Sequence, residues 1–208
     1  MPAASDRQLS NRRRRTRKDL LQAAARLVQQ GRKPSLEDVA QAALVSRATA
    51  YRYFPNIASL LNEAALDVAA PDPDIVFSGD ASDDPAERLI RAEVAMHAML
   101  VKNEVSIRMM LAHAVTQRAR HTGARDLPVR QNRRARLIQT ALAPAKKQFR
   151  PAAFDKLVKA LALFIGTEEL IVFRDVLNVD DAEAARVKHW AIRALVDAAR
   201  RQTSKQDR

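Results

Sequence analysis

The sequence predicts an all-α fold of about nine helices. Alanine and leucine dominate the composition, aromatic residues make up only 4% of the 208 residues, and there are 4 glycines. This composition favours helices over sheets, and apolar residues recur at three- to four-residue steps along most of the chain. A stretch rich in proline and aspartate, residues 71–85, marks the clearest boundary between an N-terminal and a C-terminal part.

The N-terminal part starts with a segment rich in arginine. Residues 1–11 are expected to form a disordered basic arm, and the basic run Arg12–Arg15 is expected to lead into a first helix, TRKDLLQAAARLVQQ, that ends at about Gln30. Gly31 should end this helix, because glycine readily adopts the left-handed conformation that follows many helix ends.

Two short helices are predicted within residues 35–54. Ser35 precedes an apolar periodic run and Asp38 follows three residues later, which is a weaker form of the Ser-x-x-Glu capping box. Ser46 is a second candidate cap, and Pro55 ends the second helix because proline cannot donate a backbone hydrogen bond. This arrangement is a helix-turn-helix, and its inward-facing residues are expected to be Ala40, Val45, Ala50 and Phe54.

The second of these helices leaves a set of polar side chains free to face outward or to flank a contact. They are Ser46, Arg47, Thr49, Tyr51, Arg52 and Tyr53. Hydroxyls and backbone amides at a helix N-terminus bind phosphate oxygens, and an arginine can bond guanine in the major groove. The pattern therefore favours a DNA-reading helix, while an ordinary helical hairpin with surface tyrosines is the alternative.

From about Arg12 to Ala65 the chain resembles the DNA-binding domain of the TetR (tetracycline repressor) type family, most specifically in the segment VSRATAYRYFPNIASLL. The resemblance implies a DNA-binding domain over residues 12–70. It also implies DNA contacts by Ser35, Ser46, Arg47, Thr49, Tyr51 and Tyr53. Two positions depart from the family pattern, because Leu44 replaces the usual glycine of the turn and Ile57 replaces a phosphate-binding lysine.

The positive charge is concentrated near the N-terminus. The whole chain carries +12, and residues 1–60 hold 12 lysines and arginines against 4 aspartates and glutamates, which gives +8. Such a field attracts a polyanion and makes binding sensitive to salt. A basic run alone would equally fit RNA, anionic lipid or a solvated tail, so Arg12–Arg15 is expected either to follow the DNA or to act as a solubilising segment.

The remaining helices are predicted at about residues 57–69, 85–102, 103–120, 129–147, 151–177 and 181–200, with a loop at 123–128. Residues 84–202 are expected to form a helical-bundle domain for ligand binding and dimerisation. The helix at 151–177 is apolar on more than one face, and the last helix carries a stripe of small residues at three- to four-residue steps, Ala184, Val187, Ala191, Ala194 and Ala198. Together they predict a homodimer through residues 151–200. A monomeric core is the alternative, and the TetR-type family is similarly dimeric through its last two helices.

A small-molecule site is a further hypothesis for this second domain. Methionine fills adaptable cavities, and histidines lie among several methionines of two neighbouring predicted helices. The candidate lining residues are Met96, His97, Met99, Met110, His113, Phe164 and Glu168, with methionines that merely fill the core as the alternative. Glu168 and Glu169 interrupt an apolar helix. One of them is expected to be buried and paired with an arginine of the basic helix (Arg133, Arg134 or Arg136), to meet a cationic or polar ligand, or to face water at the dimer edge.

Composition and motifs narrow the function classes. The absence of cysteine excludes disulfides and fits a reducing cytoplasm, and no apolar run approaches the roughly 18 residues that span a bilayer. No metal site, cofactor or catalytic motif is expected. We expect a homodimeric regulator of transcription that binds a palindromic operator in double-stranded DNA, a repressor released by a small-molecule effector. A nonspecific DNA-coating or architectural protein without a ligand is the alternative.

Overall fold

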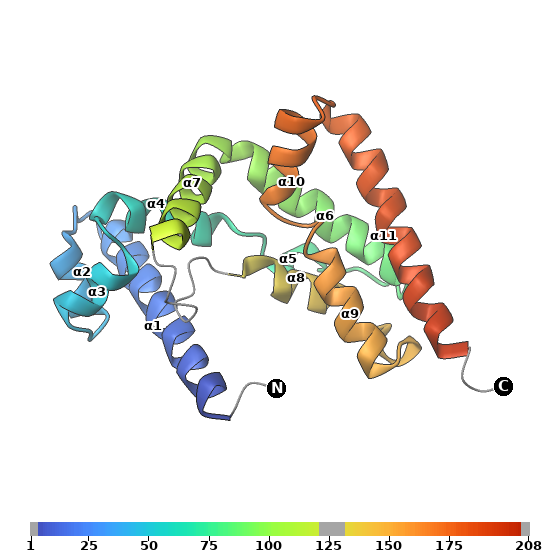
Figure 1. Ribbon diagram of the computed structural model, residues 1–208, viewed down its shortest axis with the longest axis horizontal. Coiled ribbons are helices and arrows are strands. Elements are labelled where there is room, and N and C mark those ends of the chain that lie inside the picture. The colour runs from blue at the N-terminus through green and yellow to red at the C-terminus, as the bar shows by residue number, and fades with distance from the viewer. Residues whose placement is uncertain (1–3, 121–131, 205–208) are drawn as a thin grey trace. The chain divides into compact units, whose positions relative to one another are not determined.

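The computed structural model describes residues 4–120 and 132–204, and all regular secondary structure in them is helical, with no strand (Figure 1). The predicted all-α fold is confirmed. The chain divides into two compact units: unit 1 comprises the described residues of Met1–Ala69 and Asn103–Gln131, and unit 2 those of Ala70–Lys102 and Asn132–Arg208. Among the described residues, no helix combines the length and the apolar character needed to cross a membrane.

Unit 1 contains α1 (Ala4–Gln29), α2 (Leu36–Ala42), α3 (Arg47–Tyr53), α4 (Ile57–Ala69) and α7 (Glu104–Arg120). Helix α1 packs on α2 and α4, and α2 packs on α3, around a core that includes the fully buried Leu20, Phe54 and Leu60. Helix α7 packs on α4, where the Asn62 side-chain amide donates a hydrogen bond to the Ser106 carbonyl at 3.0 Å. Residues 103–120 thus pack with the N-terminal helices, although the sequence had grouped them with residues 84–202.

The N-terminal segment differs from the expected disordered arm. Helix α1 begins at Ala4 and continues without a break through Arg12–Arg15. Residues 4–15 contain neither glycine nor proline, so nothing in the local sequence interrupts the helix. The end of α1 agrees with prediction, because Gly31 adopts a φ of +75° and its amide donates to the Val28 carbonyl at 2.9 Å.

Unit 2 is built from α6 (Pro85–Lys102), which packs against α8 (Arg133–Leu142) and α11 (Asp181–Ser204), while α9 (Pro151–Leu161) packs on α11. The shorter elements are α5 (Pro73–Val76), α10 (Glu168–Leu170), a 3₁₀ turn at Lys146–Gln148 and the π-helical segment η2 (Ile171–Val176). The loop expected at residues 123–128 lies outside the described residues.

The predicted single helix over residues 151–177 is wrong. The chain leaves helical geometry after α9 and resumes it at α10, and Arg134 of α8 lies at the break. Its guanidinium donates to the Ala162 carbonyl at 2.5 Å and to the Glu168 carboxylate at 2.6 Å, and it presses so closely on Gly166 that a Cβ would not fit there. Arg134 therefore satisfies a carbonyl that a continuous helix would have bonded internally. Of the alternatives expected for Glu168 and Glu169, Glu168 takes the pairing with an arginine of the basic helix, although its side chain stays partly exposed.

Candidate DNA-binding surface

A serine starts each helix of the helix-turn-helix. The Ser35 hydroxyl accepts a hydrogen bond from the Asp38 amide at 3.1 Å, and the Asp38 carboxylate accepts one from the Ser35 amide at 2.8 Å. This completes the predicted capping box, and the bond from the Ser35 amide is the main reason that the pKa of Asp38 is lowered. At the start of α3 the Ser46 hydroxyl accepts from the Thr49 amide at 3.1 Å. The sequence therefore placed both helices correctly.

The turn between α2 and α3 is made without glycine. Leu44 takes the left-handed conformation itself, with a φ of +56°, and the following Val45 amide donates to the Ala40 carbonyl at 3.0 Å. The Leu44 side chain is 94% exposed, whereas Val45 packs against the core. A leucine in this conformation is sterically strained. Because the Leu44 side chain is exposed, no burial of apolar surface offsets that strain.

The structure separates the predicted DNA contacts into two groups. Tyr51 is 48% exposed, and the Arg47, Arg52, Ser35 and Ser46 side chains also reach solvent, with Thr49 partly covered. Tyr53 is only 3% exposed and belongs to the core. The expectation that Tyr53 faces outward is thus corrected, because Tyr53 packs into the hydrophobic core of unit 1 and Arg17 of α1 donates a hydrogen bond to its carbonyl.

Glu37 of α2 forms hydrogen bonds with two of the exposed side chains of α3, Arg47 and Tyr51. Its Oε1 atom accepts hydrogen bonds from the Arg47 guanidinium at 3.0 Å and from the Tyr51 hydroxyl at 3.1 Å. The pKa of Glu37 is lowered by its own backbone amide and then by Tyr51, while the same bond raises the pKa of Tyr51. A carboxylate oxygen is a stereochemical stand-in for a phosphate oxygen, so Arg47 and Tyr51 are already oriented toward one anionic acceptor.

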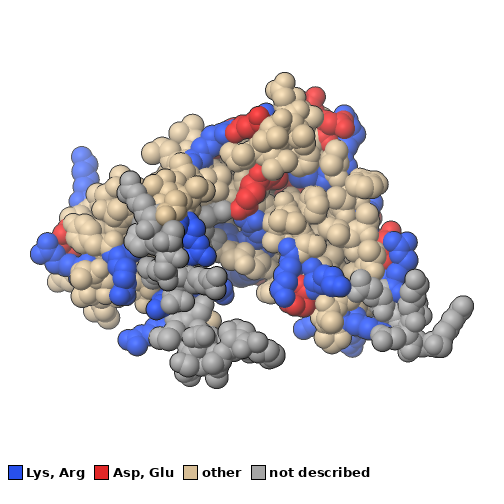
Figure 2. Space-filling model, viewed as in Figure 1, with Lys and Arg blue, Asp and Glu red and all other residues tan. Residues whose placement is uncertain are grey.

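A groove of about 390 Å³ runs between α1 and the helix-turn-helix. We call it the basic groove. Its lining comprises Arg12, Arg13 and Thr16 of α1, Leu44, Val45 and Ser46 of the turn, and Thr49, Arg52 and Tyr53 of α3. No carboxylate lines it, and Figure 2 shows lysine and arginine side chains with few carboxylates over this part of unit 1. The sequence did not predict this groove, because α1 and the turn are about thirty residues apart.

Comparison with known proteins agrees with this geometry. Residues 20–64 match the family described as bacterial regulatory proteins, tetR family, and the match spans the helix-turn-helix and its supporting helices. The protein has a TetR-family DNA-binding domain. It is accordingly a DNA-binding regulator of transcription. No curated protein and no solved structure shows significant similarity to the chain.

Beneath the surface of the TetR-family domain, a buried arginine connects helix α3 to its neighbours. Arg17 of α1 is 2% exposed and bonds both carboxylate oxygens of Glu63 on α4, at 2.5 and 3.2 Å. It also donates to the Tyr53 carbonyl at the end of α3, and its guanidinium lies 4.3 Å from the centre of the Phe54 ring. The Arg17 side chain thus joins three helices of the TetR-family domain. The hydrophobic periodicity of α1 does not reveal this role, because it marks only the apolar residues as buried.

The candidate effector residues lie in both units. Met110 and His113 are on α7 in unit 1, and burial is the main reason that the pKa of His113 is lowered. The others belong to unit 2, where Met96 and Met99 are buried in the core, Phe164 is partly buried and Glu168 is paired with Arg134. No described contact brings the seven residues together, so the ligand site stays a prediction.

His97, the remaining candidate, belongs to a buried charged cluster of unit 2. Lys188 of α11 has no exposed surface, and its ammonium lies 2.6 Å from Glu93, 3.1 Å from Glu169 and 3.2 Å from His97. His97 also bonds Glu169 at 2.8 Å, and His189 bonds Glu93 at 3.0 Å. The ligand atoms of Glu93, His97 and Glu169 are close enough together to hold a metal ion, but the lysine ammonium supplies the positive charge at their centre.

Proposed function

We propose that the protein is a homodimeric, sequence-specific repressor that binds a palindromic operator and is released by a small molecule. The observation that carries the DNA-binding part is helix α3, which presents Arg47, Tyr51 and Arg52 to solvent within the segment that matches the tetR family. A two-turn helix capped by Ser46, with an arginine at its first position, has the size and chemistry to enter the major groove.

The first test removes the predicted contacts to bases. Arg47→Ala and Tyr51→Ala should each weaken binding to the operator, selected from random duplexes by the wild-type protein, by at least about tenfold. Both side chains are exposed, so the midpoint of thermal unfolding should stay near that of the wild type. Arg136→Ala, which removes a similarly exposed arginine from unit 2, is the control for the change in charge.

Competition with random DNA separates the repressor from a DNA-coating protein. A specific regulator should prefer its operator over random duplex by about a thousandfold or more at moderate salt. Equal affinities for the two, or wild-type affinity in both Arg47→Ala and Tyr51→Ala, would reject the assignment of α3 as the reading helix.

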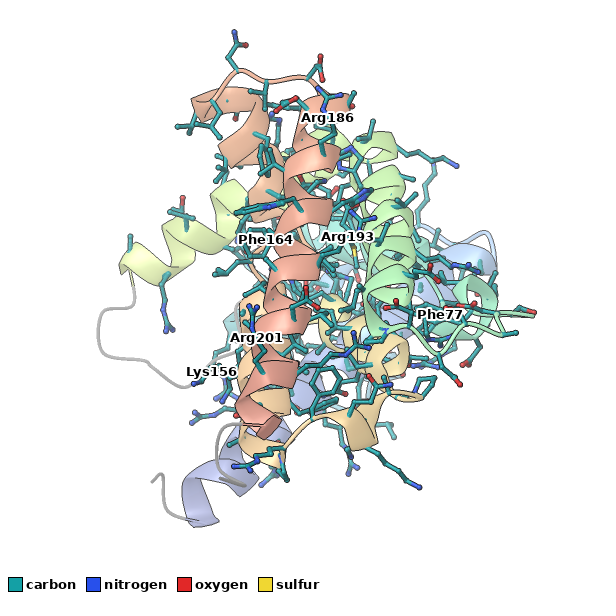
Figure 3. The ribbon with its side chains drawn as sticks, turned by 90° about the vertical axis from the view of Figure 1, so that its right-hand side faces the viewer. Phe77, Lys156, Phe164, Arg186, Arg193 and Arg201 are labelled. Atoms are coloured by element: carbon teal, nitrogen blue, oxygen red, sulfur yellow. The ribbon has the colours of Figure 1, made fainter. Side chains whose placement is uncertain are left out.

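The proposed dimer uses the outer face of α11. Val187, Trp190, Ala194 and Ala198 follow one another at three- and four-residue steps and are all exposed, with Trp190 at 70%. Figure 3 looks onto α11, with Arg186, Arg193 and Arg201 distributed along it. The segment η2 adds the exposed apolar side chains of Val172 and Val176, and Leu177 follows directly after it. The predicted stripe is corrected in one respect: Ala184 and Ala191 face the core of unit 2 instead of the partner.

An exposed tryptophan within an apolar strip is typical of a residue that anchors an interface. Trp190→Glu should therefore convert a dimer into a species with the 23.2 kDa mass of one chain, as measured by light scattering at micromolar concentration. Val94→Glu places the same charge on an exposed position of α6 and should leave the dimer intact. A wild-type protein that is monomeric at high concentration, or an intact Trp190→Glu dimer, would exclude this interface.

The proposed release step requires a small molecule that binds the protein and lowers its affinity for the operator. A ligand can change operator occupancy only through different affinities for the bound and free states of the protein. Titration of chemically diverse small molecules into the operator complex should identify a class that releases DNA. If binding to DNA resists every class while the operator itself is recognised, the protein is a constitutive regulator.

A further inference from the structure

Leu44 combines two unfavourable properties. Its φ of +56° lies in the left-handed region, which residues with a Cβ seldom adopt, and its side chain is 94% exposed. Among the described residues, Asn178 is the other non-glycine with a left-handed backbone, and asparagine tolerates that conformation far better than leucine does. A strained residue that also exposes its apolar side chain suggests a function at that position.

The surroundings of Leu44 indicate what it would meet. The basic groove brings the guanidinium groups of Arg12, Arg13 and Arg52 and the hydroxyls of Thr16 and Ser46 to the same hollow as Leu44. The Thr16 and Ser46 hydroxyls donate to the Arg12 carbonyl and the Thr49 hydroxyl, so the arginines are the groups that match phosphate oxygens. The Leu44 side chain, in contrast, gains no favourable contact from a phosphate. An occupant that satisfies both must alternate anionic and apolar groups over a few ångströms.

A strand of DNA has this alternation, because each phosphate is followed by the largely apolar face of a deoxyribose. We propose that the basic groove holds a segment of the sugar–phosphate backbone, with the arginines on phosphates and Leu44 packed against the adjacent sugar. This rests on the proposed DNA-binding function and adds a second contact beside α3. The contact contributes affinity and not base choice, because sugars and phosphates are the same at every position.

The groove also gives the helical start of α1 a role. Because α1 runs unbroken through residues 12–15, Arg12, Arg13 and Thr16 lie close together on one rigid helix, and the Thr16 hydroxyl donates to the Arg12 carbonyl at 3.1 Å. Their side chains therefore reach the turn without an ordering step of the backbone, which lowers the entropic cost of binding the strand.

The test compares leucine and arginine variants on duplex DNA at several salt concentrations. Leu44→Gly should weaken binding to the operator and to random duplex by the same factor, roughly tenfold, with the slope of log K against log salt unchanged. Leu44→Met keeps an apolar side chain and should retain affinity. Arg12→Gln with Arg13→Gln should instead flatten the slope, by about 0.9 for each phosphate that the protein no longer neutralises.

Two controls separate a contact from a change in the fold. Leu44→Gly should raise the unfolding temperature because the strain is removed, so weaker DNA binding by a more stable protein cannot be ascribed to unfolding. Asn178→Gly is the matched control, because it places glycine at the left-handed non-glycine position of unit 2. It should leave DNA affinity unchanged. Inorganic polyphosphate has no sugar. The Leu44→Gly variant should therefore bind it with wild-type affinity, whereas the double arginine variant should bind it more weakly.

The outcomes are distinct. Wild-type DNA affinity in Leu44→Gly, or an equal loss for polyphosphate, would overturn the sugar contact. An unchanged salt slope in the double arginine variant would overturn the groove as a phosphate site. Neither result depends on operator selection, because random duplex suffices for both, so a failure of sequence specificity would be recognised separately.

Discussion

Arg17→Met is expected to destabilise unit 1 by about 3–5 kcal/mol, the usual cost of removing one partner from a buried ion pair. The variant leaves the Glu63 carboxylate, which is 3% exposed, without its guanidinium partner inside the core. It also removes the donor to the Tyr53 carbonyl at the end of helix α3, the proposed recognition helix. Loss of DNA binding should therefore accompany loss of stability.

Urea unfolding of the full chain, followed by tyrosine fluorescence, is the appropriate measurement. Both tyrosines of the chain, Tyr51 and Tyr53, belong to unit 1, whereas Trp190, the one tryptophan, reports on unit 2. The double variant Arg17→Met with Glu63→Leu should recover most of the stability, since an apolar pair of similar volume has no charge to desolvate. A single variant that loses less than about 1 kcal/mol would show that water reaches Glu63 and that the pair is not truly buried.

Lys188→Met should have an effect of similar size in unit 2, again about 3–5 kcal/mol. The lysine ammonium lies between Glu93 and Glu169, which are 2% and 4% exposed, and methionine keeps its length without its charge. Two carboxylates would then face each other in the core, joined only by the histidine bonds. Trp190 fluorescence in urea should report the loss, while the tyrosine signal of unit 1 changes little.

Zinc offers an independent check of the geometry of this cluster. The ligand atoms of Glu93, His97 and Glu169 lie within 4.8 Å of one another. In Lys188→Ala the ammonium that bonds to these side chains is removed, so a metal ion could take its place. Micromolar Zn²⁺ should raise the unfolding temperature of this variant but not that of the wild type. If zinc has no effect on Lys188→Ala, the three side chains depend on the lysine for their arrangement.

The elements that the sequence predicted best are those with local signals. The capping serines Ser35 and Ser46, the stop at Gly31 and the proline after Phe54 act on backbone groups only a few residues away, so each could be interpreted without knowing the rest of the fold. The same is true of α4 and α6, whose ends agree with the predicted bounds. The polar face of α3 was recognised because its residues are close together in the sequence, and because the segment resembles the TetR-type family.

What the sequence by itself determined is therefore the all-helical fold, the helix-turn-helix and the polar composition of helix α3. The tertiary structure alone decided that Tyr53 is covered, that α7 joins the N-terminal unit, that Arg134 interrupts the long helix and that Lys188 is buried among carboxylates. It also decided that Leu44 shares a groove with α1. These outcomes depend on partners dozens of residues away in the chain, and helical periodicity shows which face of a helix is apolar but not which element will cover it.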